Sequence, residues 1–345
     1  MSRLSKYSAT LAGFGVAVAV FAVMFWLIGA ERILDALTRA DLSLVTIVFA
    51  LMLGWIVAQG LALWIVLRVL TVSMRVVDAV LVFAGAAFAN NVTPFGQAGG
   101  EPIAALLISD VSDADYETSL AAIAGADALN FVPSTSIGLL GAAVYATTTT
   151  LSRQLRFAVA SVAVFGIAIV VVALIVWRYR DAVERLLVRL ATPPLLLLSR
   201  IVPRVSTPGP ERIQEGFDDF FAAIDRIAAD RRGLAVALAL STLGMALQGT
   251  AMWLAFRALG ATIPIYVPFF VIPVGTMASI GPTPGGLGGI ESVHVLLLTA
   301  TTSVGAPIVA AAVVIHRVGG FWLTMTVGGG SMAALQARER LLASG

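Results

Sequence analysis

The sequence predicts an all-α polytopic membrane protein, an inverted repeat of transmembrane helices with two re-entrant broken-helix hairpins. Three observations lead to this fold class. The 345 residues are 59% hydrophobic and only 12% charged, whereas soluble domains carry ~25% charged residues. Several apolar stretches exceed the ~20 residues that a helix needs to cross a bilayer. Two motifs rich in glycine and proline interrupt such stretches at related positions. We therefore treat residues 1–345 as a single integral membrane domain.

Six uninterrupted stretches are long and apolar enough to cross the membrane as helices. They are residues 8–29, 42–67, 118–146, 157–177, 233–256 and 306–330. The first stretch is too long for the core of a signal peptide and has no evident cleavage site, so we expect it to be retained. Residues 76–108 and 265–302 are also apolar, but each is broken internally. The arm after the first break is too short to cross, so a re-entrant hairpin fits better than a crossing.

Residues 178–232 form the one extended polar segment of the chain, with many arginines and acidic residues. Its apolar residues recur at helical spacing, which predicts an amphipathic helix on the cytoplasmic surface of the membrane. They are Phe217, Phe220, Phe221, Ile224 and Ile227. A plain structural linker is the alternative interpretation.

The positions of lysine and arginine in short flanking segments predict the orientation in the cell membrane. Six spans and two re-entrant hairpins place both termini, and most of these cationic residues, in the cytoplasm. The first hairpin then enters from the cytoplasm and the second from outside. The formal net charge of +2 gives no footprint for nucleic acid, so we expect no nucleic-acid partner.

The chain contains an internal repeat, which must be sought before a fold is named. Gln59-Gly60-x-Ala62-x-Trp64-x-x-x-Arg68-x-Leu70 recurs 189 residues later as Gln248-Gly249-x-Ala251-x-Trp253-x-x-x-Arg257-x-Leu259. Thr93–Glu101 and Thr283–Glu291 both fit T-P-x-G-x-x-G-x-E, at an offset of 190. The repeat halves are residues 42–146 and 233–335. With six spans, the matching helices of the two halves cross in opposite directions, an arrangement found in many secondary transporters.

Both motifs should break a helix, because proline lacks an amide donor and glycine is costly in a helix. Irregular backbone at membrane depth is tolerated where it is buried in protein or lines a wet cavity. The amides of the restarting helix attract anions. Each glutamate falls in the first turn of that helix, where it can cap the amides, carry a proton, or do both. The candidate substrate-binding residues here are Thr93, Gly96, Gly99, Glu101, Thr283, Gly286, Gly289 and Glu291.

Cationic and polar residues follow the second motif. His294 lies three residues after Glu291, on the same helical face. His316 and Arg317 lie inside the last span, where an arginine is costly and points to function. We add His294 and Arg317 to the candidate substrate-binding residues. At the repeat offset Arg317 corresponds to Asp127, and we expect these two to pair across the repeat axis. Arg317 serving only to hold spans together is the alternative.

Several kinds of chemistry are not expected. The sequence has no G-x-x-x-x-G-K-[ST] motif for an ATP-driven motor. Two distant histidines and no cysteine make a metal site unexpected, and we expect no cofactor. No catalytic motif is convincing, so we do not expect an enzyme.

The motif Gly281-Pro-Thr-Pro-Gly-Gly-Leu-Gly-Gly-Ile-Glu291, together with Thr93–Glu101, resembles the lysylphosphatidylglycerol synthase transmembrane region family. The resemblance covers residues 8–335. In that family the module occurs fused to an aminoacyl transferase, attached to glycosyltransferases that use polyprenyl phosphate, or alone. The resemblance implies a multi-span module with two re-entrant hairpins that moves or binds an anionic or polar-headed lipid. No transferase domain is present in this sequence, so we do not expect it to synthesise aminoacyl lipids.

The function we expect is that of a flippase-like translocator, which moves an anionic phospholipid or a polyprenyl-phosphate-linked lipid between leaflets without ATP hydrolysis. Two alternatives stay open. One is a membrane enzyme acting on a lipid head group or lipid-linked sugar, with Glu291 and His294 as its acid–base pair. The other is a proton- or ion-coupled transporter of small solutes. The expected partner is a membrane lipid with a phosphate-bearing head group. The candidate protein partners are a second copy of the chain and a separate lipid-modifying transferase.

Overall fold

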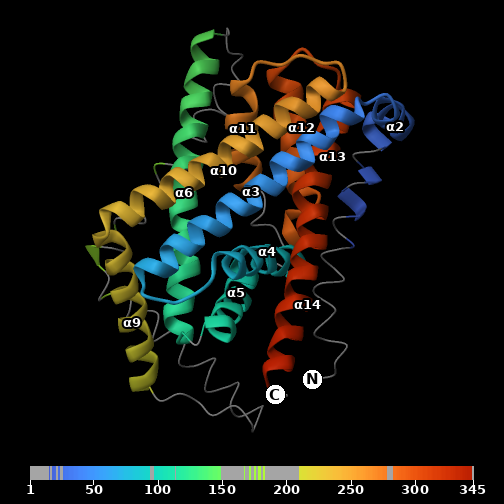
Figure 1. The fold of residues 1–345 in the computed structure, drawn as a ribbon. Coiled ribbons are helices and arrows are strands. Elements are labelled where there is room, and N and C mark those ends of the chain that lie inside the picture. Colours follow the sequence, from blue (N-terminus) through green and yellow to red (C-terminus); the bar gives the residue numbers. More distant parts are fainter. Residues whose placement is uncertain are drawn as a thin grey trace.

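The computed structural model describes residues 30–93, 97–112, 114–148, 210–277 and 283–343, with scattered residues in 15–29 and 167–182. Every regular element within these residues is a helix (Figure 1). The expected spans 8–29 and 157–177 lie largely outside the described part of the chain. The all-α prediction is confirmed for the residues that are described.

Within the described residues, four helical segments are long and apolar enough to cross a membrane, and each contains one of the expected spans. They are α3 (Leu42–Val69), α6 (Tyr116–Thr148), α10 (Arg231–Ala258) and a continuous segment made of α13 (Ala306–Arg317), the π-helical turn η3 (Val318–Trp322) and α14 (Leu323–Ala343). The shorter helices are α2 (Ala30–Thr38), α4 (Val76–Val92), α5 (Gln97–Ser112), α9 (Pro210–Ala229), α11 (Tyr266–Met277) and α12 (Gly289–Thr301).

Helices α3 and α10 form an antiparallel pair at the centre of the molecule (Figure 1). The backbone amide of Asp41, before α3, donates to the carbonyl of Ala258 at the end of α10, at 2.8 Å. At the other end, the side chain of Val69 packs against Gly233. Both helices have an aspartate as their N-cap. Asp41 and Asp230 each accept hydrogen bonds from the first free amides of their helix.

The sequences that match at an offset of 189 residues have the same local structure. The indole of Trp64 donates to the carbonyl of Met74 at 3.0 Å, and that of Trp253 donates to Ile263 at 3.1 Å. Arginines four residues later lie over these rings, at 4.7 Å for Arg68 and 5.4 Å for Arg257. Each indole therefore ties the end of a long helix to the segment that enters the following short helix.

Replacing either tryptophan with phenylalanine should destabilise the protein by a similar amount. Trp64→Phe and Trp253→Phe each remove one indole donor and leave a carbonyl unpaired, which should cost ~0.5–1.5 kcal/mol. Thermal unfolding of the purified protein in detergent would measure both losses. The matched control is Trp322→Phe, because Trp322 is 56% exposed. A large loss for one tryptophan and none for the other would contradict equivalent roles.

Two pairs of short helices lie at different levels of the molecule. Helices α4 and α5 lie in the lower half of the view in Figure 1, and α11 and α12 lie in the upper half. Helix α4 begins beside the end of α3, and α5 ends beside the start of α6, where the hydroxyl of Ser109 donates to the carbonyl of Ala114. Each pair is interrupted at its glycine-rich motif. Helix α4 ends at Val92 and α5 begins at Gln97, whereas α12 begins at Gly289, after the short 3-10 turn η2 (Pro284–Gly286).

One helix boundary differs from the expectation. Helix α5 begins at Gln97, so Glu101 lies in its second turn and not in its first. The glycines before Glu101 continue the helix instead of ending it. A Cβ atom on Gly100 would lie 1.8 Å from Oδ1 of Asn90, so glycine is required here for α4 and α5 to approach closely. Glu291, in contrast, lies in the first turn of α12 as expected.

The remaining helices cover the central pair. Helix α6 packs against α5, α9 and α11, and α14 packs against α4. Helix α9 lies within the polar segment 178–232, and it buries Ala223 and Ile227. Ile224 and Ile227 face Gly125 of α6. The apolar side of α9 thus packs on the protein, whereas the expectation placed it on the membrane surface.

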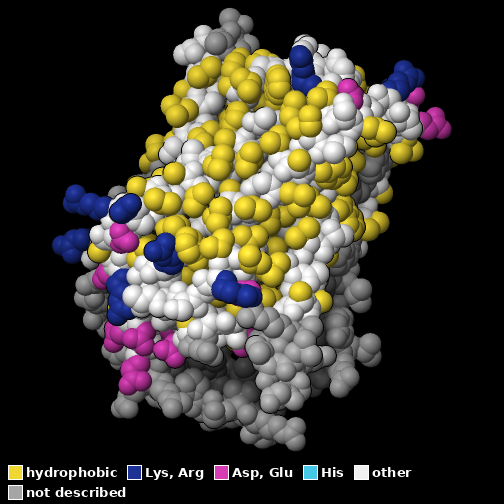
Figure 2. All heavy atoms as spheres, viewed as in Figure 1, with side chains coloured by type: hydrophobic (Ala, Val, Ile, Leu, Met, Phe, Trp, Pro, Cys, Tyr) yellow, Lys and Arg dark blue, Asp and Glu magenta, His cyan; other side chains and the backbone are white. Residues whose placement is uncertain are grey.

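Hydrophobic side chains form a broad band across the face shown in Figure 2, and charged side chains gather above and below it. The exposed apolar residues of the central pair include Leu42, Leu53, Val57, Val236 and Leu243. Contiguous apolar surface of this kind is stable against lipid and not against water. The surface therefore agrees with a protein whose solvent is the bilayer.

Candidate functional site

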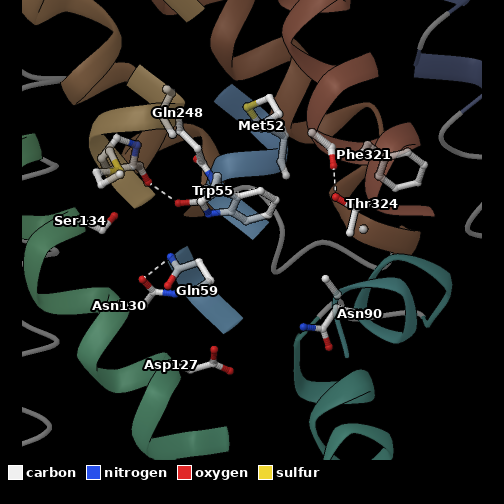
Figure 3. Close-up of a pocket in the computed structure, with 18 of the residues that line it drawn as sticks. Met52, Trp55, Gln59, Asn90, Asp127, Asn130, Ser134, Gln248, Phe321 and Thr324 are labelled. Carbon is white, nitrogen blue, oxygen red and sulfur yellow. Dashed lines mark hydrogen bonds between the residues drawn. The ribbon is translucent and has the colours of Figure 1, made fainter. Parts of the chain in front are cut away.

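A cavity of about 450 Å³ lies between the two halves of the chain (Figure 3). Its walls come from α3, α4 and α6 of the first half and from α10, α11, η2, α12, α13, η3 and α14 of the second. The volume falls within the ~300–1,000 Å³ range of small-molecule sites. Polar side chains enter it from both halves, and they include Gln59, Asn130, Ser134, Gln248, Thr276 and Thr324.

Several of these wall residues correspond to each other in the repeat. Gln59 and Gln248 match at an offset of 189, and Ser134 and Thr324 match at an offset of 190, as do Phe131 and Phe321. The amide of Gln59 donates to Oδ1 of Asn130 at 2.6 Å, which joins α3 to α6 at the cavity wall. The site residues predicted from the sequence do not include Ser134, Thr324 or the two phenylalanines. The signal that could have found them is the repeat offset, which continues beyond the glycine-rich motifs.

The second glycine-rich motif lies at the end of the cavity that contains Arg317. Gly285, Gly286 and Gly288 have φ values of 57°, 66° and 83°, a region that only glycine enters freely. The chain can therefore turn sharply before α12 begins. Glu291 then accepts a hydrogen bond from the amide of Gly288 at 2.7 Å, so it caps its own helix.

Arg317 presents its guanidinium to the cavity. Its Nε donates to Oε1 of Glu291 at 2.5 Å, and Nη2 donates to the carbonyl of Gly285 at 3.3 Å. The guanidinium also lies 5.3 Å from the ring centre of Phe321. The Arg317 side chain is 17% exposed and that of Glu291 only 3%, and only Arg317 of the two lines the cavity. No hydrogen bond from Nη1 to a described residue is found, so this group can donate to a ligand.

In the first half the equivalent positions carry two acids. Glu101 and Asp127 correspond to Glu291 and Arg317, and each pair is separated by 26 residues. The carboxyl groups of Glu101 and Asp127 lie in hydrogen-bonding contact. Asp127 lines the cavity (Figure 3). The repeat therefore places an acid–acid pair where the second half has an ion pair.

The expected pair between Asp127 and Arg317 is wrong. Both residues lie on the cavity wall, but Arg317 pairs with Glu291 and Asp127 contacts Glu101. The physical reason is that each short helix packs against the next helix of its own half, α5 on α6 and α12 on α13. This packing brings each motif glutamate to the residue 26 positions later.

Two buried histidines complete the second half of the cavity wall. His294 and His316 are 2% and 4% exposed, and their ring centres are 6.4 Å apart. Their ring nitrogens make no well-directed hydrogen bond to a described residue, although the backbones of Ile272 and Gln248 lie near enough to interact. Each ring therefore keeps at least one nitrogen free. Glu291 and His294 share no hydrogen bond within the described residues.

The residues that line the cavity do not include Thr93, Thr283, Gly286 or Gly289. The hydroxyl of Thr93 donates to the carbonyl of Ala89 at 2.8 Å, within its own helix. Thr283 is buried but, like Gly286 and Gly289, is not among the residues that line the cavity. Gly96 lies outside the described residues, and Gly99 lies in the first turn of α5.

The comparisons with known proteins agree with these features. Residues 11–328 match the family described as the lysylphosphatidylglycerol synthase TM region. Two proteins of Methanothermobacter thermautotrophicus, each named "UPF0104 membrane protein", are similar over most of their length. One is 26% identical over 321 residues, which cover 91% of both chains. The other is 26% identical over 330 residues, which cover 94% of this chain and 93% of the relative. The chain is therefore a multi-pass membrane protein that belongs to the lysylphosphatidylglycerol synthase transmembrane region family.

Proposed function

We propose that this protein is a flippase-like lipid translocator, which moves an anionic phospholipid or a polyprenyl-phosphate-linked lipid between leaflets without ATP hydrolysis. The observation that carries the proposal is the position of Arg317. It projects from a membrane-length helix into a polar cavity between the two halves, with Nη1 unpaired among the described residues. A guanidinium binds phosphate strongly and with defined geometry. An intramembrane arginine that faces a cavity is the kind of residue that marks a substrate pathway.

The arrangement of the helices supports alternating access around this cavity. We propose that residues 42–146 and 233–335 are inverted repeats, and that the α4–α5 and α11–α12 pairs are re-entrant hairpins entering from opposite sides. The antiparallel course of α3 and α10 and the different levels of the two hairpins support this view (Figure 1). In transporters of this design, substrate binds at the repeat interface and the halves rock around it. We place both termini in the cytoplasm.

The size of the cavity supports a head group as the bound part of the lipid. About 450 Å³ accommodates a phosphate with a small polar substituent, and the acyl or prenyl chains would stay in the bilayer. Translocation by this route requires the cavity to open sideways between helices. A small anionic solute could use the same polar wall without such an opening, so the deciding assay must follow lipid.

Vesicles containing the full-length protein should transfer labelled anionic lipid between leaflets. In phosphatidylcholine vesicles with a trace of fluorescent phosphatidylglycerol, dithionite bleaches only the outer leaflet, about half of the label. We expect the protein to make nearly all of the label accessible, because its cavity offers the phosphate a polar route.

The control pair for this assay is Arg317→Gln and Arg257→Gln. Arg317 lines the cavity, whereas Arg257 lies at the end of α10 over a tryptophan ring. Transfer should be lost in the first variant and kept in the second. Equal transfer by both variants, or uptake of a soluble anion without lipid transfer, would reject the proposed function.

A further inference from the structure

At one pair of equivalent positions in the cavity wall, the two halves carry side chains of opposite charge, Asp127 in the first and Arg317 in the second. Both glycine-rich motifs end in glutamate, and both glutamates contact the residue 26 positions later. In the second half that residue is Arg317, and the pair is neutral. In the first half it is Asp127, and two carboxyl groups meet. The same contact is therefore present in both halves, but its charge differs. The pair of acids in the first half needs a physical explanation.

No described cation offsets the charge of the acid pair. Glu101, from α5, is the only described titratable group that acts on Asp127. Among the other helices against α6, α3 presents Gln59, α9 and α11 present apolar side chains, and α10 presents Met245 and Gln248 to the cavity. Across the cavity, Arg317 is already paired with Glu291 and stands beside the two histidines. Two ionised carboxylates in contact repel each other strongly, so a pair of this kind holds a proton or a cation.

Unpaired polar groups around the same cavity point independently to a ligand. Oδ1 of Asn90 is buried without a hydrogen-bond partner among the described residues, and it lies against Gly100, next to Glu101. His294 and His316, both more than nine-tenths buried, line the cavity with unpaired ring nitrogens. Buried polar groups are normally hydrogen-bonded. The cavity is therefore built around polar cargo that these groups would contact.

We propose that the cavity binds one proton together with each anionic head group, and that Glu101 and Asp127 share this proton. A carboxylate accepts hydrogen bonds but cannot donate them, so a hydrogen bond between two carboxyl groups requires a proton on one of them. We assign the contact between Glu101 and Asp127 to the state that holds the proton. A phosphate bound at Arg317 adds negative charge to the same cavity and favours that proton further. Head group and proton would then cross as a neutral unit, and the proton would leave the carboxyl oxygen with the lipid.

The carboxyl pair can be tested without transport, by infrared difference spectroscopy of the full-length protein in nanodiscs. Between alkaline and neutral pH we expect the carbonyl stretch of a protonated carboxylic acid to grow in. Asp127→Asn and Glu101→Gln should each remove this band, because either change removes one of the two carboxyl groups. Glu291→Gln is the matched control and should keep it, because Glu291 pairs with Arg317 and not with a second carboxyl group.

Two results would overturn the carboxyl pair as a proton site. One is a band that stays unchanged in both first-half variants, and the other is a band that responds to Na⁺ and ignores pH. Gel filtration and thermal unfolding show whether each variant is folded. Glu101→Gln and Asp127→Asn report on the same proton, and the pH titration of the unmodified protein needs neither variant.

A second experiment measures transport, and it rests on the proposed function as a lipid translocator. In phosphatidylcholine vesicles with labelled phosphatidylglycerol, one proton per head group means that a gradient of one pH unit shifts the leaflet ratio of the label about tenfold. A potassium-diffusion potential should have no effect, because the loaded unit is neutral. Asp127→Asn should lose the pH-driven shift, and the exposed Asp219→Asn should keep it.

The two arms separate failure of the inference from failure of the proposed function. Transfer that follows the membrane potential and ignores the pH gradient would overturn proton coupling while leaving lipid transport intact. Absence of any lipid transfer, with the infrared band present and removed by Asp127→Asn, would overturn the proposed function and leave the proton site standing.

Discussion

Arg317→Gln should be the most damaging single substitution in the cavity, with a loss of ~3–5 kcal/mol in unfolding free energy. The reason is the environment of its partner. Glu291 has a 3% exposed side chain, and without the guanidinium its charge would remain buried with only the amide of Gly288 as a partner. Unfolding of the purified protein in detergent would measure the loss. Lipid transfer should disappear in the same variant, because the cavity loses its cationic donor.

A double-mutant cycle would separate the pair seen in the structure from the pair expected from the repeat. Glu291→Gln combined with Arg317→Gln should cost clearly less than the sum of the single changes, because the two side chains interact directly. Asp127→Asn combined with Arg317→Gln should be additive within ~0.5 kcal/mol. Strong coupling in the second cycle, and none in the first, would restore the pairing across the repeat axis.

The hydrogen bonds of Glu291 are relevant to the two roles expected for it, helix capping and proton transfer. The sequence left open whether this glutamate caps the restarted helix or carries a proton. In the structure one oxygen accepts from Gly288 and the other from Arg317. Both carboxylate oxygens of Glu291 are therefore occupied by donors within the protein. Glu291 is thus suited to hold Arg317 in place, whereas Glu101, which meets a second acid, is the motif glutamate suited to carry a proton.

The sequence predicted the parts of the fold that depend on composition and spacing. The membrane-length helices follow from apolar length, and the helix interruptions follow from proline and glycine. The repeat also identified which residues are equivalent, such as Asp127 and Arg317. It could not show which residues touch. Equivalent residues meet only if they lie on the symmetry axis, and here each one instead meets the glutamate of its own half.

The glycines illustrate a second limit of the sequence. Gly100 and Gly285 both belong to the repeated glycine-rich motifs and are the same residue type, but their structural roles differ. Gly100 continues a helix and lets Asn90 approach. Gly285 has a φ of 57° and lies in the break before α12. Composition predicts that such stretches are unusual, but only the surrounding packing shows whether a glycine turns the chain or lets two helices meet.

Gly285→Ala should be the second severe substitution, because it combines backbone strain with a steric clash. An alanine Cβ at this position would lie 2.6 Å from Cε2 of Phe321 and 2.7 Å from Oδ1 of Asn91. Phe321 is 2% exposed and cannot move aside freely. Left-handed backbone strain and overpacking together should cost ~2–5 kcal/mol. Lipid transfer should also fail, because the carbonyl of Gly285 is one of the acceptors that orient Arg317.

Gly260→Ala isolates the strain from the clash. Gly260 follows α10 with a φ of 72°, and an added Cβ would meet no atom within 4 Å. It should therefore cost only the ~1–2 kcal/mol of a left-handed alanine and leave transfer unaffected. Thermal unfolding and transfer of labelled phosphatidylglycerol, measured on both variants, give the comparison. Equal stability losses would mean that contact with Phe321 and Asn91 adds nothing to backbone strain. Normal transfer by a folded Gly285→Ala protein would mean that the break before α12 does not need its present shape to position Arg317.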